Sequence, residues 1–383
     1  MALSLFNGSI SASACSASTI PHPDLFGAKF SSLEATLVSN YSQDVPYEFY
    51  INHGNVNTTN LNFCNVSVTY THPGENDVVN VEVWLPTDKW NGRIQASGGD
   101  GWGAGLTPLA FKTMAGAISE GYATLSTDAG LQTTNNPSVD VNAWALASPG
   151  DVNLYLLQNL ATVSLNDAAI IGKSVVKSFY GQPAKYSYFT GCSQGGRQGY
   201  ALAQRYPDAY DGIAASAPAV NWDELITHMY SPPQFMHERG QAPRQCELNA
   251  ITAAAIKACD GDDGVVDKIV SYPEKCAFDA KTLVGTTINC TETGGSITIS
   301  SLAAEVATVV WGGLERPDNK STYYPGLSKD APFFGLANTT CTTDGNCTSV
   351  PFSVAEDVSA RWFLGILLSG SENLPRIFQI STS

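Results

Sequence analysis

Short apolar runs alternate with longer helical segments through the first half of the chain, and this alternation constrains the fold more than any other feature. Apolar alternation and runs of small or apolar residues predict strands, whereas apolar residues at helical spacing predict helices. Strands that alternate with helices are typical of a parallel sheet. The sequence therefore predicts an α/β fold with a mostly parallel sheet. The predicted strands are 78–86, 93–97, 122–126, 186–190 and 212–217, and the predicted helices are 109–120, 154–179 and about 197–205.

The alternation stops after Pro218, where the chain becomes rich in Pro, Cys, Thr and Gly with weak periodicity. We expect residues 1–220 to form the core domain and residues 221–351 to form a large inserted lid domain. Residues 352–383 are predicted to begin a segment that returns to the core. The longest apolar stretch, around residues 362–368, is far too short to span a bilayer.

The charge balance excludes some classes of partner. The chain has 20 Lys and Arg residues against 35 Asp and Glu residues, a formal net charge of −15. Nucleic acids and anionic membranes bind basic surfaces, so neither is expected as a partner. A hydrophobic content of 43% also excludes a disordered chain, and the sequence predicts a soluble acidic protein.

Cysteines and glycosylation sequons indicate a compartment. The nine cysteines show no repeated C-x-x-C spacing, which favours disulfides in an oxidising compartment over a zinc site. Eight N-x-S/T sequons favour a secreted, extracellular glycoprotein, with chance occurrence as the alternative. The first fifteen residues lack the basic and apolar regions of a signal peptide, so we expect either a mature start or an imperfect gene product. The sequons begin at Asn7, Asn40, Asn57, Asn65, Asn289, Asn319, Asn338 and Asn346.

A catalytic motif lies between a predicted strand and a predicted helix. Residues Gly191–Gly195 match G-x-S-x-G, which places Ser193 on a sharp turn as a candidate nucleophile. The following helix points its N-terminus at a developing oxyanion, and the Gln194 N–H is one candidate donor. The second donor is expected from the backbone of Gly99, Asp100 and Gly101, which follow an earlier strand. The alternatives are structural turns at both places.

An acidic loop at residues 259–269 is a candidate metal site. Its carboxylates stand at short alternating spacing around glycines, an arrangement that suits a hard cation such as Ca²⁺. No Glu closes a 12-residue EF-hand loop. The alternative is a solvated acidic turn.

The chain resembles the fungal tannase and feruloyl esterase family of α/β-hydrolases. The resemblance is carried by residues Gly191–Arg197, Tyr206–Ile213 and Ala215–Ala219, in the family's order, and extends from about Ala14 to about Leu367. It implies an α/β-hydrolase-type core with a lid. It also implies a secreted serine carboxylic ester hydrolase that cleaves phenolic-acid esters, feruloyl or galloyl, through an acyl-enzyme on Ser193. The implied substrates are small phenolic esters or plant cell-wall esters.

The resemblance also implies a metal site and disulfides. The family's lid binds a structural calcium, which makes side chains of Asp260, Asp263 and Asp267 and the carbonyls of Val265 and Ile269 the expected ligands. Cys259 is expected to pair with Cys276 as in the family. Further expected pairs are Cys15 with Cys64, Cys341 with Cys347 and Cys246 with Cys290, which leaves Cys192 unpaired in this chain. A thiol nucleophile at Cys192 is a weak alternative, because Ser193 holds the centre of the motif.

The acid and base of the triad are not found in the sequence. In this fold they follow the nucleophile, in the order acid and then histidine. His22, His53 and His72 precede Ser193, and His228 and His237 lie too early in the inserted region, where we expect surface or lid contacts.

Residues after 351 match neither the family's acid nor its His-Cys pair. We therefore expect the acid, the base and the last strands of the sheet to be absent from a C-terminally truncated chain. The alternative function is a catalytically incomplete secreted glycoprotein that binds ligand without hydrolysis.

Overall fold

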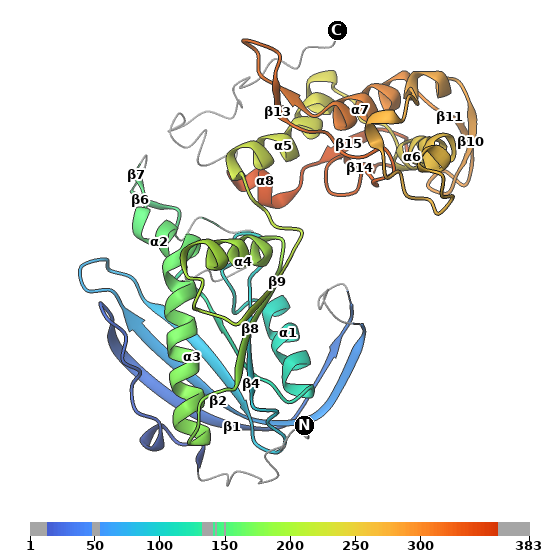
Figure 1. Ribbon diagram of the computed structural model, residues 1–383. Coiled ribbons are helices and arrows are strands. Elements are labelled where there is room, and N and C mark those ends of the chain that lie inside the picture. The colour runs from blue at the N-terminus through green and yellow to red at the C-terminus, as the bar shows by residue number, and fades with distance from the viewer. Residues whose placement is uncertain (1–13, 48–53, 132–140, 142–143, 149–150, 359–383) are drawn as a thin grey trace. The chain divides into compact units, whose positions relative to one another are not determined.

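The computed structural model describes residues 14–47, 54–131, 141, 144–148 and 151–358 of the chain. The chain divides into two compact units, residues 1–220 and residues 221–383 (Figure 1). Their roles as hydrolase core and lid stay predictions, and residues 359–383 of the predicted returning segment lie outside the described residues. Among the described helices, none is both long enough and apolar enough to cross a membrane.

A seven-stranded mixed sheet forms the first unit, in the order β1-β2-β3-β5-β4-β8-β9. Antiparallel pairing joins β1 to β2, β2 to β3 and β3 to β5. Parallel pairing joins β5 to β4, β4 to β8 and β8 to β9, so the parallel part carries the candidate nucleophile. The strands are β1 (Lys29–Val45), β2 (Val56–Thr71), β3 (Val79–Pro86), β4 (Arg93–Ser97), β5 (Ala123–Thr127), β8 (Tyr186–Cys192) and β9 (Gly212–Ser216).

Helices cover both faces of this sheet. On β3, Val83 packs in the cluster that contains residues of α3, whereas the next residue, Trp84, packs with Met114 of α1. Successive strand residues point to opposite faces, so α3 and α1 lie on opposite sides. This arrangement confirms the predicted α/β-hydrolase-type fold. The helical segments of the first unit are η2 (Ala17–Thr19), α1 (Pro108–Ser119), α2 (Leu154–Gln158), the π-helix η3 (Asn159–Val163), α3 (Ser164–Tyr180) and α4 (Gln194–Arg205), with a small hairpin of β6 (Leu146–Ser148) and β7 (Asp151–Val152).

The predicted strands and helices coincide with observed elements to within a few residues. The predicted strand at 93–97 is β4, and the predicted helix at 154–179 is the continuous run of α2, η3 and α3. The long antiparallel hairpin of β1 and β2 was not predicted. It adds the antiparallel edge to the sheet.

The second unit packs helices around a core of its own. Phe235, Leu248, Val306 and Phe333 lie in this core, from α5, α6, α7 and the chain that follows. Two-stranded hairpins and single-turn helices complete the unit. Its elements are α5 (Trp222–Arg239), α6 (Gln245–Cys259), η4 (Asp260–Asp263), η5 (Pro273–Lys275), η6 (Ala280–Leu283), β10 (Thr287–Cys290), β11 (Gly295–Thr298), α7 (Ser301–Gly312), β12 (Leu314–Glu315), β13 (Thr322–Tyr324), β14 (Asn338–Cys341), β15 (Cys347–Val350) and α8 (Ser353–Val358).

Four disulfides join the cysteine pairs expected from the sequence, and each lies within one unit. Cys15 bonds to Cys64 in the first unit, where it ties the start of the described chain to β2. The second unit holds Cys246–Cys290, Cys259–Cys276 and Cys341–Cys347. Cys192 is a free thiol.

Candidate active site

Ser193 lies on a sharp turn between β8 and α4. Its backbone has φ 58° and ψ −113°, a conformation that costs a non-glycine residue on the order of 1–3 kcal/mol. The surroundings hold it there. The Ser193 N–H donates to the Ser216 carbonyl at 3.1 Å, and the Ser193 carbonyl accepts from the Ala219 N–H at 3.0 Å. The sequence motif therefore forms a strained turn fixed by the end of β9.

Glycines allow the chain to pack closely around this turn. A Cβ on Gly191 would lie 2.5 Å from the carbonyl carbon of Gly195. A Cβ on Gly196 would lie 2.2 Å from the Ser216 carbonyl oxygen. Both distances are shorter than real Cβ contacts, so glycine is required at these positions.

The candidate oxyanion loop is held against α4 by Gln198, whose side chain is fully buried. Gln198 Oε1 accepts from the Gly99 N–H at 2.9 Å, and its Nε2 donates to the Ala104 carbonyl at 2.7 Å. A Cβ on Gly98 would lie 2.7 Å from Gly195 Cα, so the loop and the helix touch at backbone level. The sequence did not reveal Gln198, which lies only one residue beyond the motif shared with the family.

The bond to Gln198 corrects one expectation. The Gly99 N–H was included among the oxyanion donors, but its single hydrogen is directed to Gln198 Oε1. Asp100 and Gly101 therefore stay as the loop's predicted donors. Within the loop, the Asp100 carbonyl accepts from the Gly103 N–H, and the Asp100 carboxylate accepts from the Thr107 hydroxyl.

The thiol beside the nucleophile has the wrong properties for catalysis. Burial raises the pKa of Cys192, and a hydrogen bond from the Ser193 backbone only partly opposes this. The nucleophilic form of cysteine is the thiolate. A raised pKa therefore favours the inert thiol at neutral pH, and Ser193 stays the candidate nucleophile.

Among the described residues of the first unit, no histidine is hydrogen-bonded to Ser193 Oγ. His228 and His237 both belong to α5 of the second unit. His228 is buried, stacks on Tyr324, and has no hydrogen-bond partner on either ring nitrogen. Burial lowers its pKa to about 4. His53 lies outside the described residues.

His72 belongs to a buried polar cluster that sequence reasoning missed. Its Nδ1 lies 2.6 Å from Asp77 Oδ2, and its Nε2 lies 3.1 Å from Asp167 Oδ2. Burial alone would lower the pKa of His72, but hydrogen bonding to Asp77 and the charges of both aspartates outweigh it and raise the pKa. Tyr70 also donates to Asp167. Tyr70, His72 and Asp77 lie close together in the sequence, but Asp167 comes from α3, so no local pattern marks the whole cluster.

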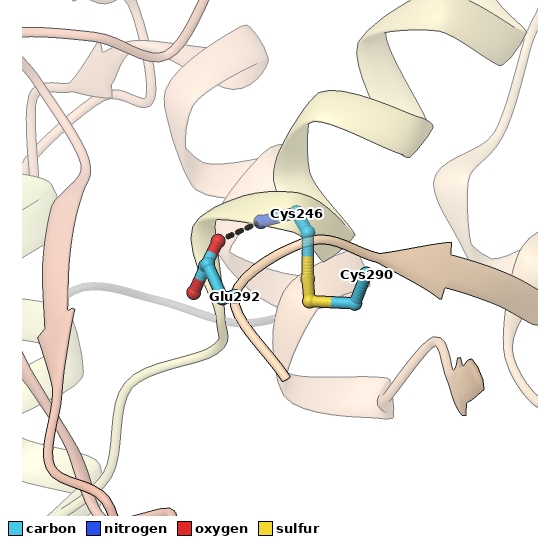
Figure 2. Close-up of side chains that lie close together, drawn as sticks. All are labelled: Cys246, Cys290 and Glu292. Atoms are coloured by element: carbon cyan, nitrogen blue, oxygen red, sulfur yellow. Dashed lines mark hydrogen bonds between the residues drawn. A yellow bond between two sulfur atoms is a disulfide. The ribbon is translucent and has the colours of Figure 1, made fainter. Parts of the chain in front are cut away.

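Two groups of side chains in the described residues have the spacing of metal ligands. One is His72, Glu75 and Asp77. The other is Cys246, Cys290 and Glu292, but Figure 2 shows that its two sulfurs form a disulfide. Glu292 Oε1 instead accepts from the Cys246 N–H at 2.8 Å and so satisfies an amide in the first turn of α6. This second group therefore has a structural role.

The predicted calcium loop is ordered by its own carboxylates. Asp260 Oδ1 accepts from the N–H groups of Asp267 at 3.0 Å and Lys268 at 2.6 Å. Asp263 Oδ1 accepts from the Val265 N–H, and Asp267 Oδ1 accepts from the Ile269 N–H. The Cys259–Cys276 disulfide closes the loop. The carboxylates of Asp260, Asp263 and Asp267 do not form one of the two groups with the spacing of metal ligands, so the segment offers carboxylate and carbonyl oxygens that are not gathered around one point.

Comparisons with known proteins agree with this geometry. Residues 64–354 match the family described as tannase and feruloyl esterase. A probable feruloyl esterase of Arthroderma benhamiae is 45% identical over 283 residues, which are 74% of this chain and 51% of that protein. A tannase of Aspergillus oryzae is 28% identical over 347 residues, 84% of this chain and 57% of that protein.

A solved structure adds a match in three dimensions. The tannin acyl hydrolase from Aspergillus niger has a TM-score of 0.77 and 26% identity, and the match covers 97% of this chain and 67% of that chain. This chain spans little more than half the length of the two curated relatives. Because the family match covers most of the chain and includes the strained turn at Ser193, the chain belongs to the tannase and feruloyl esterase family.

Proposed function

We propose that the protein is a serine carboxylic ester hydrolase that acts on phenolic-acid esters, feruloyl or galloyl. The observation that carries the proposal is the strained Ser193 turn at the end of a parallel strand, packed against the loop at Gly98–Ala104. The relatives are a probable feruloyl esterase and a tannase, and their names indicate the substrate class.

The proposed reaction proceeds through an acyl-serine. Ser193 Oγ attacks the ester carbonyl carbon, and its proton passes to a base and then to the departing alcohol. The N–H of Gln194 and an N–H of Asp100 or Gly101 stabilise the oxyanion. Water then hydrolyses the acyl-serine and releases the phenolic acid. We place the acid and base outside the described residues of the first unit, in which no histidine is bonded to Ser193 Oγ.

A fluorophosphonate probe tests the proposal, because it reacts covalently with an activated serine. Labelling of wild type and its hydrolysis of methyl ferulate or methyl gallate would support the esterase proposal. Ser193→Ala is expected to lose both properties, whereas the matched control Cys192→Ala keeps them. A folded wild-type protein that binds a phenolic ester but shows neither labelling nor hydrolysis would favour the non-catalytic binding glycoprotein instead.

We further propose that the loop at Asp260–Ile269 binds calcium. The three carboxylates and two carbonyls are all oxygen donors, the type that Ca²⁺ selects, so the residues fit this ion. Bound ion would order the second unit rather than take part in the reaction. Calcium at about 100 times its dissociation constant would add about 2.7 kcal/mol to stability. We expect EDTA to lower the melting temperature of wild type and of the control Asp262→Asn, in the same loop, but not that of Asp263→Asn.

We also propose that the protein is secreted and glycosylated. Four disulfides suit an oxidising compartment. The sequon asparagines Asn40, Asn289, Asn319 and Asn346 are exposed in the structure. Release of an expressed protein into the medium, with a mass that falls after glycosidase treatment, supports this, and retention of an unmodified chain contradicts it.

A further inference from the structure

A buried arginine connects the nucleophile turn to a π-helical turn. Arg197 lies in the first turns of α4, and its guanidinium donates from Nη1 to the Ala161 carbonyl and from Nη2 to the Leu160 carbonyl, both at 2.8 Å. These carbonyls belong to η3, the π-helical turn between α2 and α3. Single π-helical turns within α-helices often occur at functional sites. Arg197 therefore fastens α4 to an irregular turn of a neighbouring helix.

The third contact of Arg197 reaches the residue next to the nucleophile. Its Nε donates to Gln194 Oε1 at 2.6 Å. Gln194 is fully buried, and its backbone N–H is the proposed oxyanion donor. Burial lowers the pKa of Arg197 to about 10, so the side chain stays charged at neutral pH. The guanidinium is a planar, rigid group, so the three bonds fix the position of Gln194 relative to η3.

The π-helical turn is itself anchored on its other side. Asn159, which begins η3, is fully buried, and its Nδ2 donates to Asp77 Oδ2 at 2.9 Å. Asp77 in turn is bonded to the ring and the backbone of His72. Arg197 therefore contacts a π-helical turn that is itself hydrogen-bonded, through Asn159 and Asp77, to the chain between β2 and β3.

We propose that Arg197 is a positioning residue for ester hydrolysis. It acts through Gln194: the guanidinium sets the first turn of α4, and with it the direction of the N–H that stabilises the oxyanion. This inference rests on the proposed esterase function. A misplacement of about 1 Å in such a site can lower the rate about 100-fold.

Arg197→Ala, Arg197→Lys and the control Arg205→Ala test the proposal. Arg205 is an exposed residue of the same helix, and its Nη1 lies 3.4 Å from Thr162 Oγ1 of the same π-helical turn. We expect Arg197→Ala to lower kcat on methyl ferulate by about 10- to 100-fold with little change in KM. We expect the kcat of Arg197→Lys to lie between those of Arg197→Ala and wild type, because one ammonium group cannot span three acceptors in fixed directions. Arg205→Ala is expected to match wild type.

Chemical rescue separates positioning from a general loss of structure. Arg197 lines a surface cavity of about 550 Å³, so small cations can reach the space that its side chain would leave. Millimolar guanidinium is expected to restore part of kcat in Arg197→Ala, whereas ammonium is not. Folded Arg197→Ala or Arg197→Lys with wild-type kcat overturns the proposal. The proposal is also overturned if kcat falls only in proportion to the amount of folded protein and guanidinium does not restore it.

Amide hydrogen exchange gives a readout that does not need hydrolysis. If Arg197 fixes the first turn of α4, exchange at residues 194–198 rises in Arg197→Lys, while exchange in β8 stays as in wild type. If wild type hydrolyses no ester, the esterase proposal fails, and this exchange measurement alone decides the positioning role. Unchanged exchange at residues 194–198 then overturns it.

Discussion

Gln198 offers the sharpest test of how the oxyanion loop is built. Gln198→Met keeps the size and shape of a fully buried side chain but removes its amide. The Gly99 N–H and the Ala104 carbonyl, now 2.9 and 2.7 Å from their partners, would both lose a hydrogen bond. Each buried group left unpaired costs about 1–3 kcal/mol, so the first unit should lose about 2–6 kcal/mol of unfolding free energy.

Urea unfolding followed by tryptophan fluorescence measures this loss, and hydrolysis of methyl ferulate measures the effect on the loop. Gln204→Met is the matched control, because Gln204 is exposed on the same helix. We expect Gln198→Met to lower both stability and kcat, and Gln204→Met to change neither. If the two variants unfold alike and keep wild-type kcat, Gln198 does not hold the loop.

Gln198→Glu adds a dependence on pH. A protonated carboxyl can accept from the Gly99 N–H and donate to the Ala104 carbonyl, whereas a carboxylate opposes that carbonyl. Burial and the Ala104 oxygen should raise the pKa of the new carboxyl in the folded state. Relative to wild type, the stability of this variant should therefore be greatest at low pH and fall as the pH rises through that raised value. Unfolding of both proteins at several pH values checks this, and a variant that gains stability relative to wild type as the pH rises contradicts it.

Three further predictions follow from other contacts. Gly196→Ala should destabilise the first unit by about 1–3 kcal/mol, since its Cβ would overlap the carbonyl at the end of β9, and a melting temperature equal to wild type contradicts this. The raised pKa of His72 stabilises the fold at pH below the usual imidazole value, and this contribution is lost as the pH rises through the raised value. Burial would raise the pKa of Asp77, but hydrogen bonds from His72 lower it, so its contribution is lost only as the pH falls through the lowered value. In wild type, the melting temperature should therefore fall as the pH rises through the raised pKa of His72, and His72→Gln should remove this fall. A melting temperature that depends on pH in the same way in both proteins refutes the role of His72. Asn65 should carry no glycan, because its Nδ2 donates to Glu82 and its Oδ1 is buried, whereas exposed Asn319 should carry one, and peptide mass spectrometry after glycosidase treatment distinguishes them.

The parallel part of the sheet could be predicted from the sequence because its short strands alternate along the chain with segments of helical spacing. The β1–β2 hairpin could not, because its strands are rich in Ser, Thr and Asn and much of β1 is exposed. A β-bulge with Asn40 at φ 56° also breaks the regular alternation. Sequence periodicity detects burial on one face, and β1 buries too little to show it. On β2, Cys64, Val66, Val68 and Tyr70 alternate with less buried residues and are fully buried, so this strand did carry a signal that was missed.

The nucleophile turn was predictable because its residues are contiguous and glycine is required by close packing. The contacts that support it were not. Gln198 reaches back 99 positions to Gly99, and Arg197 reaches back 36 positions to Ala161. Such contacts form only when segments far apart in the sequence, such as β4 and β8, become neighbours. No local sequence pattern indicates which segments will do so.

The order of the strands has a consequence for how the chain folds. Arg93 of β4 pairs with Tyr186 of β8, so a long loop that contains α1, β5 and α3 must close before these strands meet. Pairings between residues far apart in the chain form slowly. The strained conformation of Ser193 depends on β8 and β9 being already in place. Reactivity of this serine should therefore be among the last properties that the refolding chain acquires, well after its helical signal has returned.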